Sequence, residues 1–366
     1  MKTKVLFVVN SLQGGGAERV VSTLGNCLNR EIFTVVIVCL ARAPMVYSVS
    51  DRVKVVSLVS RKEPETIFYR VWYATLTFVG LLSVIWKEKP ACAISFMTSA
   101  NLWTGITCRL LRVPYFVSER ITPDYTIHQF NALFKWLSFK IYSRSEAIVI
   151  PARKMEECFK KYKRFNSVRN FRTINNPVST FRTESRDLVH TRKFILSVGR
   201  LHPQKGFDKL IEAFSLLQPI DVDLLISGEG AERERLQKQI NRLNLRDKVK
   251  LIGFKNNIQD YYQQAEMFVL SSKNEGYPNA LVEAMSFGCA CVSTDCEFGP
   301  SEIITDNENG LLVTVGDTEG MAQAISMILG DSRLKQKFSE NAKKINETNS
   351  LAAISAKWEN LILSHV

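Results

Sequence analysis

One pattern recurs along nearly the whole chain, a short apolar run followed by a longer segment with helical spacing. In the first half these runs are residues 4–9, 34–40, 53–59, 91–96, 115–119 and 146–150. In the second half they are residues 194–199, 222–228, 249–254, 267–272, 290–294 and 310–313. Strands that are apolar throughout and alternate with helices are typical of parallel sheets covered by helices on both faces. The pattern therefore predicts an α/β protein.

The two series of runs predict two domains. A chain of 366 residues is longer than one ordinary hydrophobic core requires. A polar, charged stretch at about residues 178–192 separates the series. We therefore expect two Rossmann-like, doubly wound domains that face each other across a cleft, the first spanning 1–180 and the second 190–349.

In doubly wound domains ligands bind at the carboxyl ends of the strands, where helix N-termini present free N–H groups. The first run leads into Gly14, Gly15 and Gly16, which let a backbone approach an anion closely. Arg19 stands where a dinucleotide fingerprint needs its third glycine, and the chain has no P-loop motif. The glycines indicate an anion loop, and a simple tight turn is the alternative.

Two cations follow the first strand of the second series. Gly199 ends that strand, Arg200 comes next, and Lys205 precedes the following helix. A planar guanidinium and a compact ammonium together suit a diphosphate, although two solvated surface cations fit the same pattern. Gly228 ends the next strand and is expected to line the same cleft.

Phe254 and Lys255 follow a further strand of the second series. At a strand end they would offer a place for a flat base to rest.

The stretch "NEGYPNALVEAMSFG" places Glu275 after a predicted strand and Glu283 inside the helix that follows. Asn279 is a good N-cap, and Ala280 and Leu281 would offer free backbone N–H groups. About one turn into the helix, Glu283 can accept two neighbouring hydroxyls, as a ribose diol requires. Glu275 could hold the hydroxyls of a second group. A nucleotide-sugar would use all of these residues.

Metal-binding residues are sparse in the sequence. Asp221 and Asp223 form a DxD pair of the kind that metal-dependent sugar transferases use, but the pair precedes its strand, at the end opposite the expected cleft. The eight cysteines form no CxxC pair, and the four histidines are not spaced with them for a metal. We expect a reduced protein that needs no metal and no other cofactor.

Two segments of the second half resemble the signature segments of the retaining glycosyltransferases of family four, which have the GT-B fold. These segments are "GRLHPQKG" and "NEGYPNALVEAMSFG". The stretches "EFGPSEII" and "NGLLV" resemble the family's next segments, and "SLQGGGAERVV" resembles its N-terminal loop. The resemblance covers nearly the whole chain and is densest from residue 194 to 315.

This resemblance assigns roles to the residues named above. Arg200 and Lys205 would bind the donor diphosphate, Glu283 the ribose, and Glu275 the transferred sugar. Further donor contacts would come from Gly15, Gly16, Asn279, Ala280 and Leu281. The terminal helix, residues 350–366, would return to the first domain.

The resemblance also implies transfer from a UDP-sugar, with GDP as the alternative, and retention at the anomeric carbon. Because no residue stands out as a covalent nucleophile, we expect a front-face displacement in which the departing diphosphate takes the acceptor proton. Arg200, Lys205 and Glu275 are the expected catalytic group.

The sequence departs from the family after the fifth strand of the first domain. Many members carry a histidine there that touches the donor sugar, whereas this chain has Arg120, preceded by Glu119. We expect these two residues on the acceptor and sugar side of the site.

The first half of the chain is strongly basic. Residues 1–190 hold 28 Lys and Arg against 13 Asp and Glu, in a chain of net charge +12. Cations alternate with aromatic residues over 134–173, which favours a surface facing anionic lipid. An ordinary pair of amphipathic helices covering a sheet is the alternative.

Two apolar segments bear on the membrane. The apolar run over residues 71–86 is shorter than a bilayer span and is predicted to be a buried helix. The N-terminal run is predicted to be a strand and not a signal peptide.

Together these features predict a transferase that moves a hexose or N-acetylhexosamine from a UDP-sugar to a polyprenyl-diphosphate-linked saccharide. Such an enzyme would serve surface polysaccharide or glycan biosynthesis and would lie peripherally on the inner face of the cytoplasmic membrane. A GT-B-fold sugar-nucleotide epimerase is the alternative, and it would convert donor without an acceptor. A basic nucleic-acid-binding protein is less favoured because no binding module is present, and no nucleic-acid partner is expected.

Overall fold

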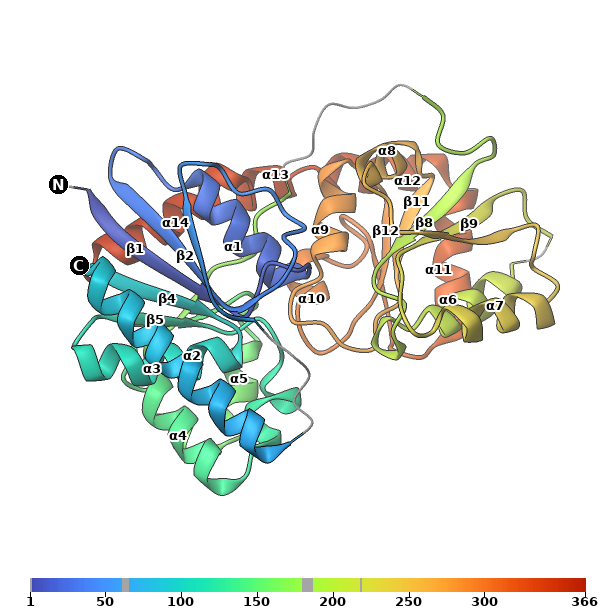
Figure 1. Cartoon of the computed structure of the whole chain (residues 1–366). Helices are drawn as coiled ribbons and strands as arrows, with labels where there is room; N and C mark the ends of the chain where they lie inside the picture. Colours follow the sequence, from blue (N-terminus) through green and yellow to red (C-terminus); the bar gives the residue numbers. More distant parts are fainter. Residues whose placement is uncertain (1, 61–65, 180–186, 218) are drawn as a thin grey trace. The chain divides into compact units, whose positions relative to one another are not determined.

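The computed structural model describes residues 2–60, 66–179, 187–217 and 219–366. The chain divides into two compact units (Figure 1). Unit 1 comprises Met1–Pro177 and Leu351–Val366, and unit 2 comprises Val178–Ser350. Each is an α/β unit built on one parallel sheet, as the alternating pattern predicts.

Unit 1 contains a seven-stranded sheet in the order β3-β2-β1-β4-β5-β6-β7, with every neighbouring pair parallel. Its strands are β1 Thr3–Val9, β2 Phe33–Arg42, β3 Lys54–Ser60, β4 Cys92–Phe96, β5 Tyr115–Ser118, β6 Ile148–Ile150 and β7 Phe171–Thr173. The apolar runs predict the first six. The last strand escapes prediction because Phe-Arg-Thr is short and largely polar.

Helices cover both faces of the unit 1 sheet (Figure 1). They are α1 Gly16–Cys27, α2 Ile67–Glu88, α3 Thr98–Leu111, α4 Ala132–Tyr142, α5 Met155–Lys160 and α14 Leu351–Leu363. The C-terminal helix α14 completes the core, where fully buried Trp358 packs on Phe96 with ring centroids 5.8 Å apart. All five tryptophans of the chain belong to this unit.

The prediction that residues 71–86 form a buried helix is wrong in one respect. The segment is helical, as part of α2, but only one side of the helix is buried, through Thr77, Leu81 and Ile85. Trp72 and Trp86 on the other side are 55% and 66% exposed. A helix that lies on one face of a sheet can bury only a stripe of its surface. Among the described residues, α2 is the one helix long and apolar enough to cross a membrane by length and composition.

The expected lipid-facing surface over residues 134–173 is corrected as well. Phe159, Phe165 and Tyr142 have almost no exposed surface and pack against one another, with ring centroids 5.3 to 6.2 Å apart. Only α4, at the start of the span, exposes large apolar side chains, Phe134 and Trp136 among them. Most aromatics of this span therefore cover the edge of the sheet around β6 and β7, which is the alternative that the pattern left open.

Unit 2 contains a six-stranded parallel sheet in the order β10-β9-β8-β11-β12-β13. Its strands are β8 Phe194–Val198, β9 Asp223–Ser227, β10 Val249–Gly253, β11 Met267–Leu270, β12 Cys291–Thr294 and β13 Leu311–Val313. All six coincide with the predicted runs. Asp223 opens β9 and accepts from His190, so the DxD pair lies at the amino end of its strand.

The helices of unit 2 lie between these strands and after the last one. They are α6 Phe207–Ser215, α7 Arg233–Arg242, α8 Ile258–Gln264, α9 Asn279–Ser286, α10 Pro300–Ile303, α11 Thr318–Gly330, α12 Ser332–Ala342 and α13 Ile345–Thr348. Helix α6 contacts both α7 and α11. Leu210, Ile211 and Phe214 of α6 are fully buried in the core cluster under this layer.

Candidate active site

The strand order of unit 2 reverses between β8 and β11, which are neighbours in the sheet although the chain leaves them toward opposite edges. A doubly wound sheet has its ligand crevice at the carboxyl ends of such a pair, because the following connections diverge there. The loop after β8 carries Arg200 and Lys205, and the loop after β11 carries Glu275. The predicted residues of the two segments therefore meet at the point where a ligand crevice is expected.

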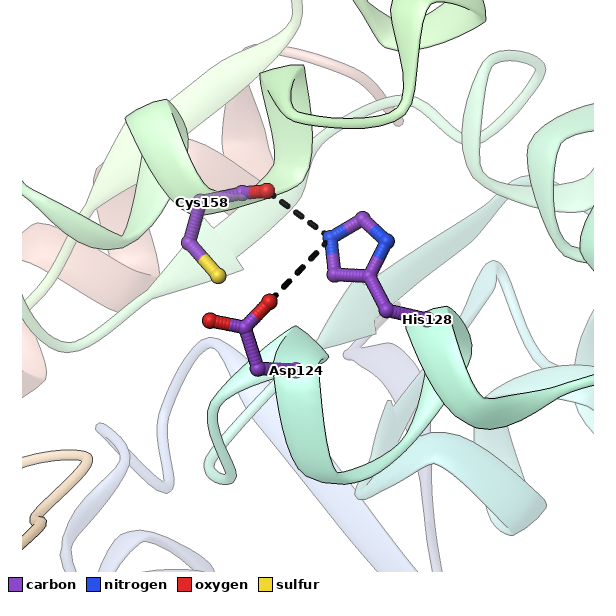
Figure 2. Close-up of side chains that lie close together, drawn as sticks. All are labelled: Asp124, His128 and Cys158. Carbon is purple, nitrogen blue, oxygen red and sulfur yellow. Dashed lines mark hydrogen bonds and ion pairs between the residues drawn. The ribbon is translucent and has the colours of Figure 1, made fainter.

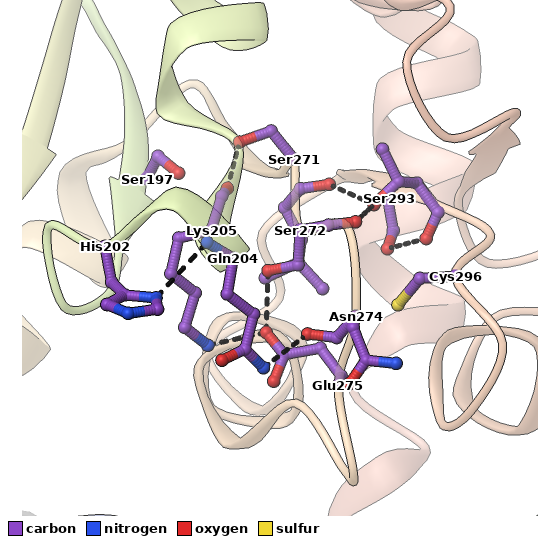
Figure 3. Close-up of polar contacts among 12 residues, drawn as sticks. Ser197, His202, Gln204, Lys205, Ser271, Ser272, Asn274, Glu275, Ser293 and Cys296 are labelled. Atoms are coloured by element: carbon purple, nitrogen blue, oxygen red, sulfur yellow. Dashed lines mark hydrogen bonds and ion pairs between the residues drawn. The ribbon is translucent and has the colours of Figure 1, made fainter. Parts of the chain in front are cut away.

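Hydrogen bonds hold these two loops together (Figure 3). The Ser271 hydroxyl donates to the Lys205 carbonyl at 2.9 Å, and the Lys273 N–H donates to the Gln204 carbonyl at 2.8 Å. Gly206 adopts φ 63°, and a Cβ there would lie 2.1 Å from the Ser271 carbonyl oxygen. Only glycine allows both this conformation and this close approach.

An ion pair joins the loops at their side chains. The Lys205 Nζ lies 2.6 Å from Glu275 Oε1, and the Ser272 hydroxyl donates to the same oxygen at 2.6 Å (Figure 3). The exposed fractions of the two charged side chains are 23% and 8%. The sequence motifs suggest that the lysine and the glutamate are separate ligand groups. The structure shows that they form one pair, in which each holds the other in place.

Glu283 lies on α9 and is almost fully buried. Its Oε1 accepts from the Ser179 hydroxyl at 2.7 Å, and its Oε2 accepts from the Tyr262 hydroxyl at 3.1 Å. The Tyr262 ring is itself stacked on Phe287, with the ring planes 14° apart. Each oxygen of a carboxylate has two lone pairs, so it can in general accept more than one hydrogen bond. The carboxylate is thus oriented by hydroxyl donors of the kind predicted for its ligand, and no sequence motif marks either donor.

The start of α9 differs from the expectation. Asn279 is the first residue of the helix and not its N-cap, a position that Pro278 takes without a side-chain hydrogen bond. The Leu281 N–H is not free, because it donates to the Pro278 carbonyl at 3.0 Å. Proline has no side-chain acceptor, so its carbonyl closes the first turn instead. For the N–H of Ala280, the other predicted donor, the described residues show no backbone hydrogen bond outside those internal to helices and strands.

The remaining predicted donor residues of unit 2 follow the strands beside this pair. Arg200 is exposed after β8. Gly228 follows β9, where a Cβ would lie 1.9 Å from the Gly199 carbonyl oxygen. Phe254 is 65% exposed after β10, and the Lys255 ammonium lies 5.9 Å from the centre of the Tyr261 ring. Their positions fit the expectation, and their roles stay predictions.

The glycine loop of unit 1 precedes α1, which begins at Gly16. The Gly15 N–H donates to the Tyr47 hydroxyl at 3.4 Å. The Glu18 side chain folds back over the loop, so that a Cβ on Gly15 would lie 2.4 Å from its Oε2. A phosphate at Gly15 and Gly16 would have to displace this carboxylate, and the predicted contact remains a prediction.

Glu119 has no exposed surface in unit 1, which was not expected of an acceptor-side residue. Its carboxylate accepts from the Tyr142 hydroxyl at 2.6 Å and from the Thr98 hydroxyl at 3.0 Å. Burial raises the pKa of Glu119 to about 7, although these hydroxyls oppose the shift. In this structure Glu119 therefore organises the carboxyl ends of β4 and β5 from within.

Arg120 is partly exposed, but its guanidinium packs inward, with Cζ 5.5 Å and 5.9 Å from the ring centres of Phe96 and Trp358. Its Nη1 donates to Asn176 at 2.5 Å. Its Nε and Nη2 are buried and have no hydrogen-bond partner among the described residues. Burial lowers the pKa of Arg120 to about 9. A role on the sugar side stays a prediction for this residue.

The raised pKa of Glu119 predicts a pH-dependent stability of unit 1. The folded state holds this proton more tightly than the unfolded chain, whose carboxyl titrates near 4.5. The contribution to the free energy of unfolding is therefore largest below pH 4.5 and falls by about 3 kcal/mol as the pH rises through 7. In Glu119→Gln this fall should be absent, as measured by urea unfolding across that range. Tryptophan fluorescence reports it, because every tryptophan is in unit 1. The control is Glu146→Gln at an exposed carboxyl, and equal slopes in both variants would contradict the assignment.

Asp124, His128 and Cys158 of unit 1 lie close enough together to suggest a metal site (Figure 2). Each already has a protein partner. His128 Nε2 lies 2.9 Å from the Cys158 carbonyl oxygen, and Lys161 donates to Asp124 at 2.7 Å. Burial and the nearby Asp124 carboxylate raise the pKa of the Cys158 thiol to about 12. Because Lys161 and the Cys158 carbonyl already engage Asp124 and His128, we assign no metal to this cluster.

Two protein-family models match the chain. "Glycosyltransferase Family 4" matches residues 14–182, and "Glycosyl transferases group 1" matches residues 180–345. The two matches meet near the boundary between unit 1 and unit 2.

Two curated relatives from Campylobacter jejuni match almost end to end. The chain is 30% identical, over 93% of its length and 94% of the relative, to N-acetylgalactosamine-N,N'-diacetylbacillosaminyl-diphospho-undecaprenol 4-alpha-N-acetylgalactosaminyltransferase. It is 25% identical, over 98% of both chains, to GalNAc-alpha-(1->4)-GalNAc-alpha-(1->3)-diNAcBac-PP-undecaprenol alpha-1,4-N-acetyl-D-galactosaminyltransferase.

Solved structures share the fold at low identity. HepE from Anabaena in complex with UDP has a TM-score of 0.81 at 18% identity, covering 100% of both chains. Sucrose-phosphate synthase from Thermosynechococcus elongatus has a TM-score of 0.80 at 19% identity, covering 99% of both chains. The meeting of two signature loops at the switch point of unit 2 agrees with these matches. The chain belongs to the family-four, group 1 glycosyltransferases and has the GT-B fold.

Proposed function

We propose that this glycosyltransferase moves a hexose or N-acetylhexosamine from a UDP-sugar to a polyprenyl-diphosphate-linked saccharide, with retention at the anomeric carbon. The observation that carries the proposal is the Lys205–Glu275 pair at the switch point of unit 2. Glu283 lies on the helix that follows the same loop, at the carboxyl ends of the strands. A cation, a sugar-binding acid and a diol-binding acid are the groups that a nucleotide-sugar requires.

Each part of the donor has a candidate partner. Arg200 and Lys205 would neutralise the diphosphate, because charge-assisted hydrogen bonds to phosphate oxygens are the strongest available here. Glu283, already oriented by two hydroxyls, would accept the ribose hydroxyls. Glu275 would accept hydroxyls of the transferred sugar. The likeness to HepE, whose structure contains UDP, supports uridine as the nucleoside.

The acceptor is inferred from the relatives. Both Campylobacter jejuni enzymes are named for undecaprenol-linked diphosphate acceptors and for the transfer of N-acetylgalactosamine. An acceptor of this class carries its saccharide on a lipid, so the enzyme must work at a membrane surface. We place it peripherally on the inner face of the cytoplasmic membrane, in surface polysaccharide or glycan biosynthesis.

The chemistry proposed is a front-face displacement. The bond from the anomeric carbon to the donor phosphate oxygen breaks while the acceptor oxygen bonds to the same face. The acceptor proton passes to the departing diphosphate, which becomes the leaving UDP. Lys205 and Arg200 would stabilise the charge that develops on that diphosphate, as preorganised cations do in a site shielded from water. The step uses no metal.

The test combines donor panels with product analysis. The protein is incubated with UDP- and GDP-sugars, with and without a polyprenyl-diphosphate-linked acceptor and a chelator, and the new linkage is identified by NMR. The expected product is an α-linked saccharide from an α-linked UDP-sugar, formed only with acceptor and unaffected by chelator. Conversion of donor alone would establish an epimerase instead. Displacement of the donor by RNA or DNA would favour the nucleic-acid-binding alternative.

A further inference from the structure

Helix α2 of unit 1 is apolar on two sides. Thr77, Leu81 and Ile85 face inward and are buried against the unit. On the outer side Phe68 is 81% exposed and Val79 is 54% exposed, in line with the exposed Trp72 and Trp86. A surface helix of a soluble protein normally has a polar outer side. The outer side of α2 is therefore suited to a partner that is itself apolar.

The exposed apolar side chains continue beyond α2. Helix α3 contacts both α2 and α4, and the three helices form one layer on the same face of the unit 1 sheet (Figure 1). On α4, Phe134 and Trp136 are 47% and 42% exposed. We define the α2–α4 surface by the exposed side chains of Phe68, Trp72, Val79, Trp86, Phe134 and Trp136. Exposure of this many large apolar side chains on two helices of one layer marks an interaction surface.

The charges on this layer are almost all positive. Helices α2, α3 and α4 carry five cations: Arg70, Lys87, Arg109, Lys135 and Lys140. Their one acid, Glu88, is turned inward and paired with Lys4 at 3.1 Å and Lys54 at 2.5 Å. Cations on the same helices as exposed apolar side chains complement a surface that combines negative charge with apolar depth, as an anionic bilayer does.

Tryptophan is enriched where protein meets the bilayer interface, since its ring is apolar and its N–H is polar. Trp72 and Trp86 lie 14 residues apart on α2, about 21 Å along the helix axis. Both could enter the interface only if α2 lies parallel to the bilayer. A spanning orientation would tear the inner side of α2 from unit 1, where Leu81 and Ile85 are fully buried.

We propose that the α2–α4 surface is the membrane-docking surface of unit 1, with α2 lying flat in the interface of an anionic bilayer. The inference deepens the proposed function and rests on it, because the proposed acceptor is carried by a membrane lipid. It moves the lipid-facing region from residues 134–173 to α2 and the outer side of α4.

The test is flotation of the full-length protein with vesicles. Wild type is expected to float with vesicles of phosphatidylglycerol and phosphatidylethanolamine and to stay behind with phosphatidylcholine alone. Phe68→Glu with Trp72→Glu should lower the partition to anionic vesicles about tenfold or more, because two apolar anchors become charged. The matched control is Met327→Glu, an apolar side chain that is 52% exposed in unit 2. It should leave the partition unchanged.

A second pair of variants tests the charges. Arg70→Glu with Lys135→Glu should also weaken anionic binding, and added salt should weaken wild-type binding, since counterions screen surface attraction. Equal flotation of wild type and all variants would overturn the proposal. Resistance of the bound protein to alkaline carbonate would show a spanning helix and overturn it as well. The proposal would also be overturned if the wild-type protein formed a dimer without lipid and the Phe68→Glu, Trp72→Glu variant were monomeric.

Donor binding separates this inference from the proposed function. UDP-induced thermal stabilisation should be the same in wild type and in the surface variants, because none of the substituted residues is a predicted donor ligand. Flotation without any UDP effect would refute the proposed function and leave the docking surface standing. A UDP effect without flotation would refute the docking surface and leave the proposed function standing.

Discussion

Replacing Glu275 by glutamine is expected to lower kcat by about 10² to 10³-fold, with a smaller change in the KM for the donor. The substitution keeps the shape of the side chain and removes its charge. Lys205 would lose the carboxylate that holds it at 2.6 Å, and the transferred sugar would lose a charged acceptor. Both losses act on the transition state, when the diphosphate departs and the sugar becomes cationic. The effect therefore falls on kcat, which is measured in steady state at saturating donor.

Two further variants make this prediction specific. Glu283→Gln should raise the KM for the donor more than it lowers kcat, because the ribose does not react. Glu234→Gln, at an exposed carboxyl on α7, should change neither constant. Undiminished turnover in Glu275→Gln would remove this residue from the mechanism.

The sheets and the signature loops were predictable from sequence for one physical reason. A parallel strand buried on both faces must be apolar along its length, so runs such as 267–270 stand out from their surroundings. Side chains that follow such runs gather where the parallel strands have their carboxyl ends. The sequence alone therefore predicts that Lys205 and Glu275 lie at the same end of the strands. The strand order that makes the site a switch point, β8 beside β11, is a tertiary property and appears only in the structure.

What escaped prediction depends on contacts between distant segments. The Tyr262 and Ser179 hydroxyls reach Glu283 from 21 and 104 residues away, and no local pattern marks them. Periodicity indicates that α2 is apolar but not which neighbours cover it, so its exposed side was missed. The opposite error arose at Phe159 and Phe165, which alternate with cations yet lie in the core. An alternating pattern is shared by lipid-facing and sheet-covering helices, and only packing distinguishes them.

The Lys205–Glu275 pair also changes how donor binding is understood. In a partly buried ion pair each charge satisfies the other, so a diphosphate bound as we propose would have to share Lys205 with a carboxylate already in contact. Arg200 is exposed at the end of the same strand, and its guanidinium can turn to a ligand. Arg200 is thus suited to first capture of the diphosphate, and Lys205 to its placement in the site.

The double substitution Arg200→Ala with Lys205→Ala is therefore expected to weaken UDP binding by about 10² to 10⁴-fold. Each charge-assisted hydrogen bond contributes about 1.5 to 3 kcal/mol, and 1.4 kcal/mol corresponds to a tenfold change in Kd. The measurement is isothermal titration calorimetry with UDP. Arg200→Ala alone should show a smaller loss with unchanged thermal stability. Lys205→Ala alone should lower the Tm as well, because it leaves the buried Glu275 without its cation.

A neighbouring lysine provides the control for this series. Lys273 lies in the loop after β11. Its side chain is exposed, and its ammonium pairs with Asp208 at 3.6 Å. Lys273→Ala removes the same charge from the same unit, so it reports the general effect of net charge on UDP binding. It should change the Kd by less than about threefold at physiological salt, where exposed charges are screened. Unchanged UDP affinity in the double variant would show that the diphosphate binds elsewhere. A site that binds the diphosphate through these two cations must lose affinity when both are removed.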